Sequence, residues 1–355
     1  MSHACRGGRA GAILAVALVG ALLTPLTAWL TGPAAAQPAP AEQVYLALGD
    51  SIAAGLVTTL PRLRGYPWLV RDLIAQSAVG REAPAVTLIN RAVPGETARS
   101  FLAGGQVQQA RADIAAARAR GAQVRAVTIS LGGNELLNLA GSGEAERQAG
   151  LTQFRSVYPA VLGAVKAALG DTPAEIVVTT SYDLSAGDPS VAGSDAWWVH
   201  QFNEVIRQAA AAAGVRVADL EPAFRGHIRD WTWYPTDVHP NNAGHAAIAQ
   251  LVWQALGYDQ TPPSVTVERP APRALDRRLA TVRVRATDDV GVTRVELLAG
   301  GEYVGELLYV PSQDAYLGIW DGRDWAEPTA RLTVRASDLA GHQTEAQFEV
   351  ALPGS

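Results

Sequence analysis

Short apolar runs alternate with longer stretches of helical periodicity over residues 44–256. Uninterrupted apolar runs are typical of buried strands, whereas apolar residues three and four positions apart are typical of helices that pack on a sheet. This alternation predicts a parallel sheet with helices on both faces. The predicted strands are 44–48, 87–90, 126–131, 175–180 and 215–219, and the predicted helices are 66–76, 106–120, 151–169, 196–213 and 243–256.

The pattern changes after the polar and proline-rich segment 259–263, where helical periodicity ends. Period-two alternation follows and predicts a small β-sandwich of half-buried strands joined by turns. Asp288, Asp289 and Asp338 stand in two similar turns, where capping of the turn is their expected use and calcium binding is the alternative. The predicted strands are 281–286, 292–298, 302–308, 331–336 and 346–351.

The first residues have the pattern of a cleaved export signal. Arg6 and Arg9 precede an apolar run over residues 10–30, and small residues follow, with Ala34 and Ala36 spaced as at a cleavage site. An uncleaved membrane anchor is the alternative, because the run is long enough to span a bilayer. We expect cleavage, hence a secreted or cell-envelope protein without a stable membrane span.

This organisation predicts four segments, and the composition argues against a disulfide in the mature chain and against a nucleic-acid partner. They are a signal peptide (1–36), a linker (37–43), an α/β domain (44–259) and an all-β domain (260–355). The single cysteine, Cys5, lies in the signal, so the mature chain is expected to hold no disulfide. The net charge of −5 argues against a nucleic-acid partner, since such proteins usually carry a basic face.

Three predicted strands end in segments suited to chemistry. Ser51 follows the first strand, Gly95 the second and Asn134 the third. The carboxyl ends of parallel strands meet at one edge of a sheet, so these segments are expected to face one another. A serine can attack a carbonyl carbon when a base removes its proton. Glycine allows close approach of a backbone N–H to a ligand, and the asparagine amide can donate to a developing oxyanion.

The base is expected to be His239, in the segment 236–245 just before the last helix. Asp237 lies two positions earlier, where it could orient the imidazole. His200 is expected to pack in the core and His245 to pack or to face solvent. Three aromatic residues before the base, Trp231, Trp233 and Tyr234, are candidates for the substrate cleft, with hydrophobic packing under a loop as the alternative.

In order and placement these segments resemble the blocks of the SGNH hydrolases, the GDSL esterases and lipases. The resemblance covers Val44 to Tyr258 and implies a flavodoxin-like three-layer α/β/α sandwich. It implies Ser51 as nucleophile and His239 as general base. It also implies an oxyanion hole made by the backbone N–H groups of Ser51 and Gly95 and by Asn134. No metal and no cofactor are implied.

The chain departs from the family pattern at two positions. Asn134 is followed by Glu135 where the family usually has Asp, a mild change because Asn134 supplies the donor. The family's last block usually places its Asp three residues before the His, and that position is Thr236 here, with Asp237 two before. We expect Asp237 to act as the acid of the triad. No Gly-x-Ser-x-Gly elbow is found, which argues against the α/β-hydrolase alternative.

The C-terminal domain resembles the bacterial Ig-like modules of secreted enzymes, through the similar turns 286–292 and 336–341. A spacer is its expected role, and contact with a polysaccharide or the cell wall is the alternative. The whole chain is thus predicted to be a secreted serine esterase that cleaves carboxylic esters of small molecules or polymers. The alternatives are a lipase or phospholipase, a carbohydrate acetyl esterase, or a non-catalytic surface-binding protein on the same fold.

Overall fold

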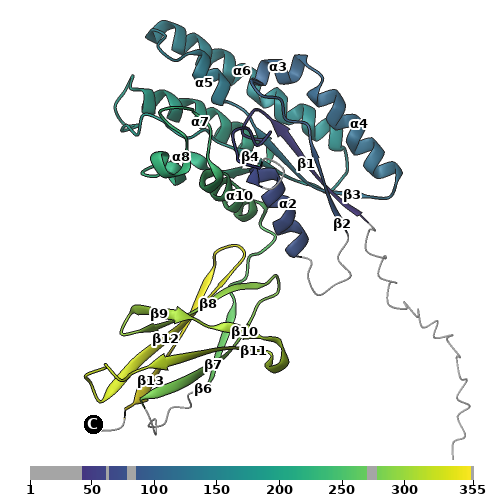
Figure 1. Cartoon of the computed structure of the whole chain (residues 1–355). Helices are drawn as coiled ribbons and strands as arrows, with labels where there is room; N and C mark the ends of the chain where they lie inside the picture. The colour runs from purple at the N-terminus through teal and green to yellow at the C-terminus, as the bar shows by residue number, and fades with distance from the viewer. Residues whose placement is uncertain (1–41, 61–63, 78–84, 270–277, 353–355) are drawn as a thin grey trace, which may run out of the picture. The chain divides into compact units, whose positions relative to one another are not determined.

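The computed structural model describes residues 42–60, 64–77, 85–269 and 278–352 (Figure 1). The predicted signal peptide and most of the predicted linker lie outside the described residues. Contacts group Ala39–Ser355 into one compact unit. None of the helices in the described ranges has the length and apolar character needed to cross a membrane.

The N-terminal half is built on a parallel sheet of five strands in the order β2-β1-β3-β4-β5. This is the strand order of flavodoxin-like folds, which place their sites at the carboxyl ends of the strands. The predicted α/β/α fold is confirmed. The strands are β1 (Glu42–Gly49), β2 (Ala85–Asn90), β3 (Gln123–Ser130), β4 (Glu175–Thr179) and β5 (Arg216–Ala218).

Strand β1 shows why its predicted segment, residues 44–48, is apolar throughout. Val44, Leu46 and Leu48 pack into one hydrophobic core, and Tyr45 and Ala47 pack into another on the opposite face. Successive side chains of a strand point to opposite faces, so a strand covered on both sides needs apolar residues at every position.

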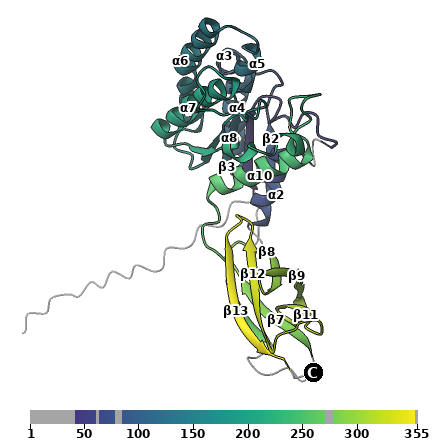
Figure 2. The ribbon, with the colours of Figure 1, turned by 90° about the vertical axis from the view of Figure 1, so that its left-hand side faces the viewer.

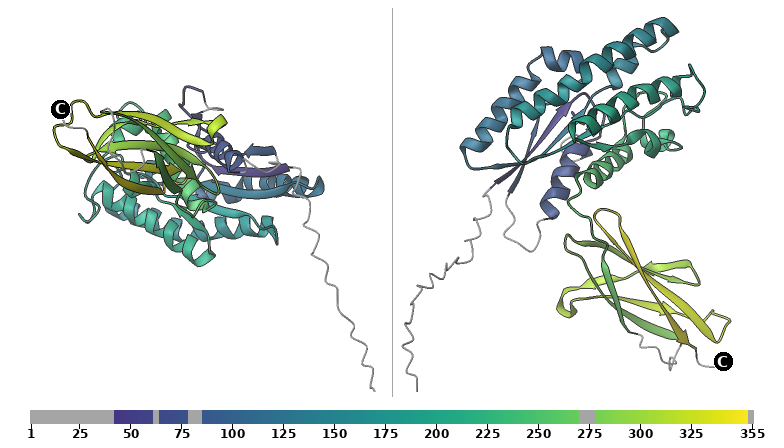
Figure 3. Two further views of the ribbon diagram at one scale, coloured as in Figure 1. Left: turned by 90° about the horizontal axis from the view of Figure 1, so that it is seen from below. Right: turned by 180° about the vertical axis from the view of Figure 1, so that it is seen from behind.

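Helices lie on either side of this sheet (Figures 1 and 3). The first core is closed by α3 (Ala98–Ala103), α4 (Gln106–Ala119), α6 (Glu144–Leu169) and α7 (Asp195–Ala213). The second is closed by α2 (Tyr66–Gln76), α8 (Leu220–Phe224), α9 (Ile228–Trp231) and α10 (Asn242–Leu256).

Four short helices, α3, α5, α8 and α9, were not predicted, because four to six residues are too few to display a helical period. Helix α3 is signalled by a capping box, in which the Thr97 side chain accepts from the Ser100 N–H and the Ser100 hydroxyl accepts from the Thr97 N–H. Helix α5 (Gly133–Asn138) begins directly after β3. Helix α6 begins at Glu144, earlier than predicted, with acidic residues in its first turn.

The C-terminal domain is a sandwich of two antiparallel sheets, β10-β11-β7-β6 and β13-β12-β8-β9. Figure 2 shows β12 and β13 running side by side. The predicted β-sandwich is confirmed. Its strands are β6 (Ser264–Arg269), β7 (Leu279–Thr287), β8 (Val292–Ala299), β9 (Glu302–Glu306), β10 (Leu308–Val310), β11 (Ala315–Asp321), β12 (Thr329–Asp338) and β13 (Gln343–Ala351).

The predicted single strand over 302–308 is wrong, because the chain changes sheets within it. Leu307 separates β9 from β10, is buried in the sandwich core, and donates its N–H to the Val295 carbonyl at 2.8 Å. Strands β6 and β11 were not predicted.

One buried histidine makes the stability of the fold depend on pH. His245 on α10 is fully buried, and its Nδ1 accepts a hydrogen bond from the Tyr66 N–H at 3.2 Å. Burial disfavours the charged imidazolium and lowers the pKa of His245 to about 4, against 6.5 for an exposed histidine. Between these values the unfolded chain binds the proton and the folded chain does not.

We therefore expect the free energy of unfolding to fall as the pH is lowered from about 6.5 to about 4, by about 3 kcal/mol from this residue. In His245→Asn, whose Oδ1 can still accept from Tyr66, this slope should largely disappear even if the protein is less stable overall. Urea unfolding at several pH values measures it. The exposed His227→Asn is the control, and an unchanged slope in His245→Asn would contradict the assignment.

Candidate active site

The end of β1 sets the position of Ser51. Gly49 has φ +121°, and a Cβ there would stand 2.1 Å from the Ser130 carbonyl oxygen, so the close approach of β1 to β3 requires glycine. The next N–H, that of Asp50, donates to the same carbonyl at 3.0 Å. Ser51 then begins a series of turns, in which Leu56 N–H donates to the Ser51 carbonyl.

Ser51, His239 and Asp237 form a continuous chain of hydrogen bonds. The Ser51 Oγ lies 2.8 Å from His239 Nε2, and His239 Nδ1 lies 2.5 Å from Asp237 Oδ1. The same carboxylate oxygen also accepts the His239 backbone N–H at 2.8 Å. The structure thus brings together, from positions 188 residues apart, the side chains predicted as nucleophile, base and acid.

The segment that carries the base is held on both sides. The hydroxyl of Tyr182 donates to the Val238 carbonyl at 2.6 Å, and Trp233 N–H donates to the His239 carbonyl at 3.1 Å. The Thr236 hydroxyl donates to the Trp233 carbonyl at 2.6 Å, within its own turn. The Thr236 side chain therefore stabilises the turn, and the Asp237 side chain contacts the imidazole of His239.

Asp237 is ionised in this setting. Partial burial raises the pKa of its carboxyl, but the hydrogen bonds from the His239 backbone and ring outweigh that effect and hold the pKa below its ordinary value. Its side chain is 39% exposed. A negative Asp237 fixes the Nδ1–H tautomer of His239, which leaves Nε2 free to accept a proton from Ser51.

The two other predicted segments lie beside the triad. Gly95 has φ +84°, and a Cβ there would meet open space, so the backbone conformation rather than crowding requires glycine. Asn134 donates one hydrogen of its amide to the Glu96 carbonyl at 2.8 Å, which fixes the amide and leaves its second hydrogen available. Among the described residues, no acceptor takes the N–H of Ser51 or Gly95.

A buried polar network that the sequence did not reveal supports these segments. Gln106 on α4 accepts the Gly49 N–H at 2.6 Å and donates both to the Gly49 carbonyl at 3.0 Å and to Glu96 at 2.7 Å. It therefore ties the end of β1 to the turn that carries Gly95. The bonds join residues 57 and 10 positions apart, and helical periodicity marks Gln106 only as the start of a helix.

Asp50, the residue before the nucleophile, is also buried. Its Oδ1 accepts from the Ile52 N–H at 3.0 Å and from the Ser130 hydroxyl at 3.1 Å. Burial raises the pKa of this carboxyl to about 7, against the lowering effect of those hydrogen bonds. Asp50 thus fixes the turn at Ser51 to the end of β3.

A cavity of about 260 Å³ opens beside the triad. Ser51, Asn134 and His239 line it together with a largely apolar wall, which includes Leu131, Leu136, Leu137, Leu139, Trp198 and Phe202. A cavity with an apolar wall and a few convergent polar groups is the usual form of a small-molecule site.

Two predictions about aromatic and histidine side chains are corrected by this geometry. Of the three aromatic candidates, the cavity lining includes Tyr234 but neither Trp231 nor Trp233, although the structure describes all three. Trp231 instead stacks on His227, with 4.3 Å between ring centroids, as the packing alternative required.

The second correction concerns His200, which does not pack in the core. Its side chain is 37% exposed, and its Nδ1 lies 2.9 Å from the buried Glu221, which also pairs with Arg207. The buried member of this pair is Glu221, not His200. The periodicity of the predicted helix places His200 on a helix but does not show that its partner lies on α8.

Residues 47–247 match the profile of the GDSL-like Lipase/Acylhydrolase family, and residues 263–334 match that of the bacterial Ig domain. The first match covers more than half of the chain. The protein therefore belongs to the GDSL-like lipase/acylhydrolase family and is a hydrolase of ester bonds.

Several solved structures are similar to the chain. LAE5, an alpha/beta hydrolase from the metagenome of Lake Arreo, is 17% identical over 61% of this chain and 96% of its own, with a TM-score of 0.44. Axe2, an acetylxylan esterase from Geobacillus stearothermophilus, is 19% identical over 60% and 94%, also at 0.44. An extracellular lipase from Streptomyces rimosus is 20% identical over 60% and 99%, at 0.43. No curated protein matched the chain.

Proposed function

We propose that the protein is a serine esterase that forms an acyl-enzyme on Ser51. The observation that carries this proposal is the chain of hydrogen bonds from Ser51 through His239 to Asp237, with links of 2.8 and 2.5 Å. A nucleophile in contact with a base, which a third group orients, is the arrangement that activates a serine hydroxyl.

The first step acylates the enzyme. Nε2 of His239 takes the hydroxyl proton as Ser51 Oγ forms a bond to the ester carbonyl carbon. The tetrahedral intermediate collapses, the bond to the alcohol oxygen breaks, and the imidazolium gives its proton to that oxygen. The second step repeats the sequence with water as nucleophile and releases the acid.

The developing oxyanion needs donors that are already in place. The available N–H groups of Ser51 and Gly95 and the second amide hydrogen of Asn134 are suited to this role. Asn134 is the best fixed of the three, since the Glu96 carbonyl holds its amide at 2.8 Å. Gln106 supports the same edge through Gly49 and Glu96.

We expect Asn134→Ala to lower kcat by about 10²–10³-fold, the usual effect of removing one oxyanion-hole donor. KM should change little, because the charge develops only in the transition state. Steady-state kinetics on p-nitrophenyl acetate measure both constants. Asn138→Ala, on the same short helix α5, serves as the control, and an unchanged kcat in Asn134→Ala would remove this residue from the oxyanion hole.

The apolar wall of the cavity favours an acyl chain of several carbons over acetyl alone. Leu136, Leu137 and Phe202 offer hydrophobic contacts that grow with each methylene group. A lipase-like preference is therefore the second candidate function beside a short-chain or carbohydrate acetyl esterase.

A substrate series tests the proposal. The wild-type protein should hydrolyse p-nitrophenyl esters without added metal and react with a fluorophosphonate probe at Ser51. Comparison of acetate, butyrate and octanoate esters with acetylxylan separates the acyl preferences. If acetylxylan exceeded all the p-nitrophenyl esters, the acyl-chain candidate would be wrong, and absence of both hydrolysis and labelling would contradict a serine esterase.

We further propose that the protein is exported through the N-terminal signal. The pattern of Arg6 and Arg9 before the apolar run supports this, as does the small-residue pair Ala34 and Ala36. N-terminal sequencing of the protein from the culture medium tests it, with a first residue near position 37 expected. Retention of the full chain in the membrane would contradict cleavage.

A further inference from the structure

Asp259 is a buried carboxylate whose nearest cationic group is His342, with Nδ1 3.8 Å from Oδ1, beyond hydrogen-bond distance. It stands in the segment after α10, and its side chain is fully inaccessible to solvent. Neither carboxylate oxygen accepts a hydrogen bond from any described residue. Burying a charge is costly unless it is paired or binds a metal, so this carboxylate requires a compensating group.

Aspartates from two turns of the β-sandwich surround it. In the turn between β7 and β8, Asp288 Oδ1 accepts from the N–H groups of Val290 and Gly291 at 2.8 and 2.7 Å. In the turn between β12 and β13, Asp338 Oδ1 accepts from the His342 N–H at 2.8 Å. The expected turn capping is therefore confirmed for Asp288 and Asp338, whose backbone caps use one oxygen of each carboxylate.

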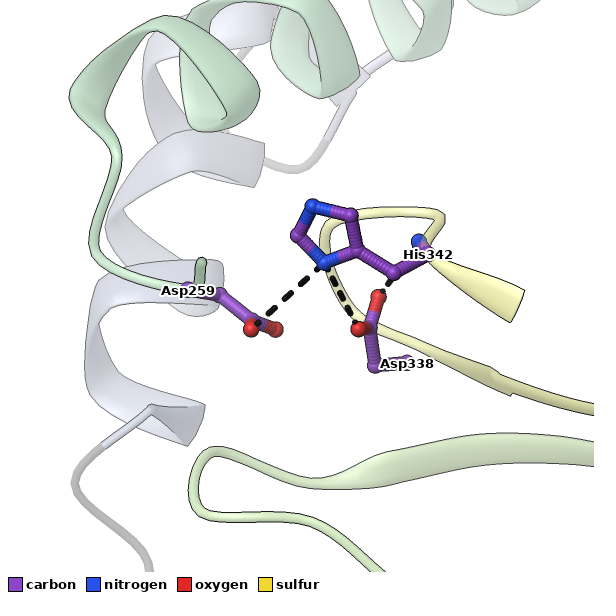
Figure 4. A group of neighbouring side chains, drawn as sticks. All are labelled: Asp259, Asp338 and His342. Carbon is purple, nitrogen blue, oxygen red and sulfur yellow. Dashed lines mark hydrogen bonds and ion pairs between the residues drawn. The ribbon is translucent and has the colours of Figure 1, made fainter. Parts of the chain in front are cut away.

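The other oxygens converge on Asp259. A buried Asp288 Oδ2 is without a partner among the described residues. Ligand atoms of Asp259, Asp288 and Asp289 all lie within 4.8 Å of one another, as do those of Asp259, Asp338 and His342. Figure 4 shows Asp259 and Asp338 pointing toward each other, with the His342 ring beside them.

So many carboxylates in one place disfavour their own ionisation. Burial, followed by the charges of Asp338 and Asp288, raises the pKa of Asp259 to about 6. His342 opposes this effect, with Nδ1 at 2.9 Å from Asp338 and 3.8 Å from Asp259.

We propose that Asp259, Asp288, Asp289 and Asp338 bind a calcium ion. The converging ligands are carboxylate oxygens, which hard cations prefer. Calcium tolerates irregular geometry and many ligands, whereas magnesium demands a near-ideal octahedron. His342 then acts as a positioning residue, whose Nδ1–H donates to Asp338 and orients its carboxylate.

The ion stabilises the join between α10 and the two turns. Gln250 and Gln254 on α10 donate to the carbonyls of Leu339 and Ala340, each at 2.8 Å. Asp259 follows the same helix, so a cation would add a third link there. None of the proposed ligands lines the cavity beside Ser51, and the role is thus structural.

Calcium binding is tested on the full chain after treatment with EDTA and removal of the chelator. Titration with CaCl2 in a calorimeter should show one site per chain. Calcium at about 100 times Kd should raise the melting temperature by on the order of 5 °C, and MgCl2 at the same concentration should raise it less.

Asp259→Asn is the decisive variant. It removes the charge without breaking any hydrogen bond among the described residues, because neither carboxylate oxygen accepts one. It should fold, keep hydrolysing p-nitrophenyl acetate, and lose both the binding heat and the calcium-dependent shift. Asp171→Asn, which changes an exposed aspartate after α6, should keep both.

Three results would overturn the proposal. The first is absence of calcium binding by the wild-type chain. The second is calcium binding that Asp259→Asn leaves unchanged. The third is tighter binding of ZnCl2 than of CaCl2 that His342→Gln abolishes, since this would assign the cluster to a transition metal held by the imidazole.

Discussion

Replacement of Ser51 by alanine is expected to lower kcat on p-nitrophenyl esters by about 10⁶-fold, as removal of the nucleophile does in serine proteases. Without the hydroxyl, His239 has no attacking oxygen to deprotonate, and only direct attack by water remains. The variant should fold normally, because Ser51 is small and its Oγ bonds to His239 alone among the described side chains. A stopped or continuous assay of p-nitrophenol release measures the loss.

The control for this variant is Ser156→Ala. Ser156 lies exposed on α6, and its hydroxyl donates to the carbonyl of Gln153 at 2.7 Å. The Ser156→Ala variant should keep wild-type activity and react fully with a fluorophosphonate probe. The Ser51→Ala variant should react with neither the substrate nor the probe. A Ser51→Ala protein that turned over esters at the wild-type rate would end the acyl-enzyme mechanism.

The fold could be predicted where local pattern and tertiary environment agree. Strand β1 is buried on both faces over residues 44–48, so every position there is apolar and the run is visible in the sequence. Helix α5 and the change of sheet at Leu307 could not be found in this way. Helix α5 is too short to show a helical period in the sequence. The change of sheet at Leu307 depends on which of the two sheets each half of the segment joins, and the sequence pattern does not record this.

The same distinction holds at the site. Ser51 and Asn134 could be predicted because strand ends in a parallel sheet share one edge. The roles of Gln106 and Asp259 could not, since their partners come from distant segments that only the folded chain brings together. The choice between Tyr234 and its tryptophan neighbours as cavity lining depends on the path of one loop, which no sequence period records.

The proposed acid of the triad lies where the chain departs from the family pattern, because Thr236 occupies the position three residues before His239. The structure places the Thr236 hydroxyl on the Trp233 carbonyl and the Asp237 carboxylate on the imidazole. Oδ1 of Asp237 accepts both the backbone N–H and the ring N–H of His239, so an aspartate one residue nearer to the histidine still reaches the imidazole. Asp237 and His239, which are two positions apart, therefore lie in one compact turn.

Asp237→Ala is therefore expected to lower kcat by on the order of 10⁴-fold, the loss found when the acid of a serine triad is replaced. A somewhat smaller loss is favoured, since the side chain is 39% exposed and water can partly replace it. Asp237→Asn should be comparably impaired, because an amide can donate to Nδ1 and select the wrong tautomer of His239.

Thr236→Ala is the matched control, since it removes one turn hydrogen bond and no contact with the imidazole; its kcat should stay within about threefold of wild type, a change of under 1 kcal/mol in the barrier. The pair of variants decides the assignment by rank. If Thr236→Ala lost more activity than Asp237→Ala, the acid would be at the family's usual position. If both kept wild-type kcat, His239 would be oriented by the backbone of the turn, and the carboxylate would serve only to hold the loop.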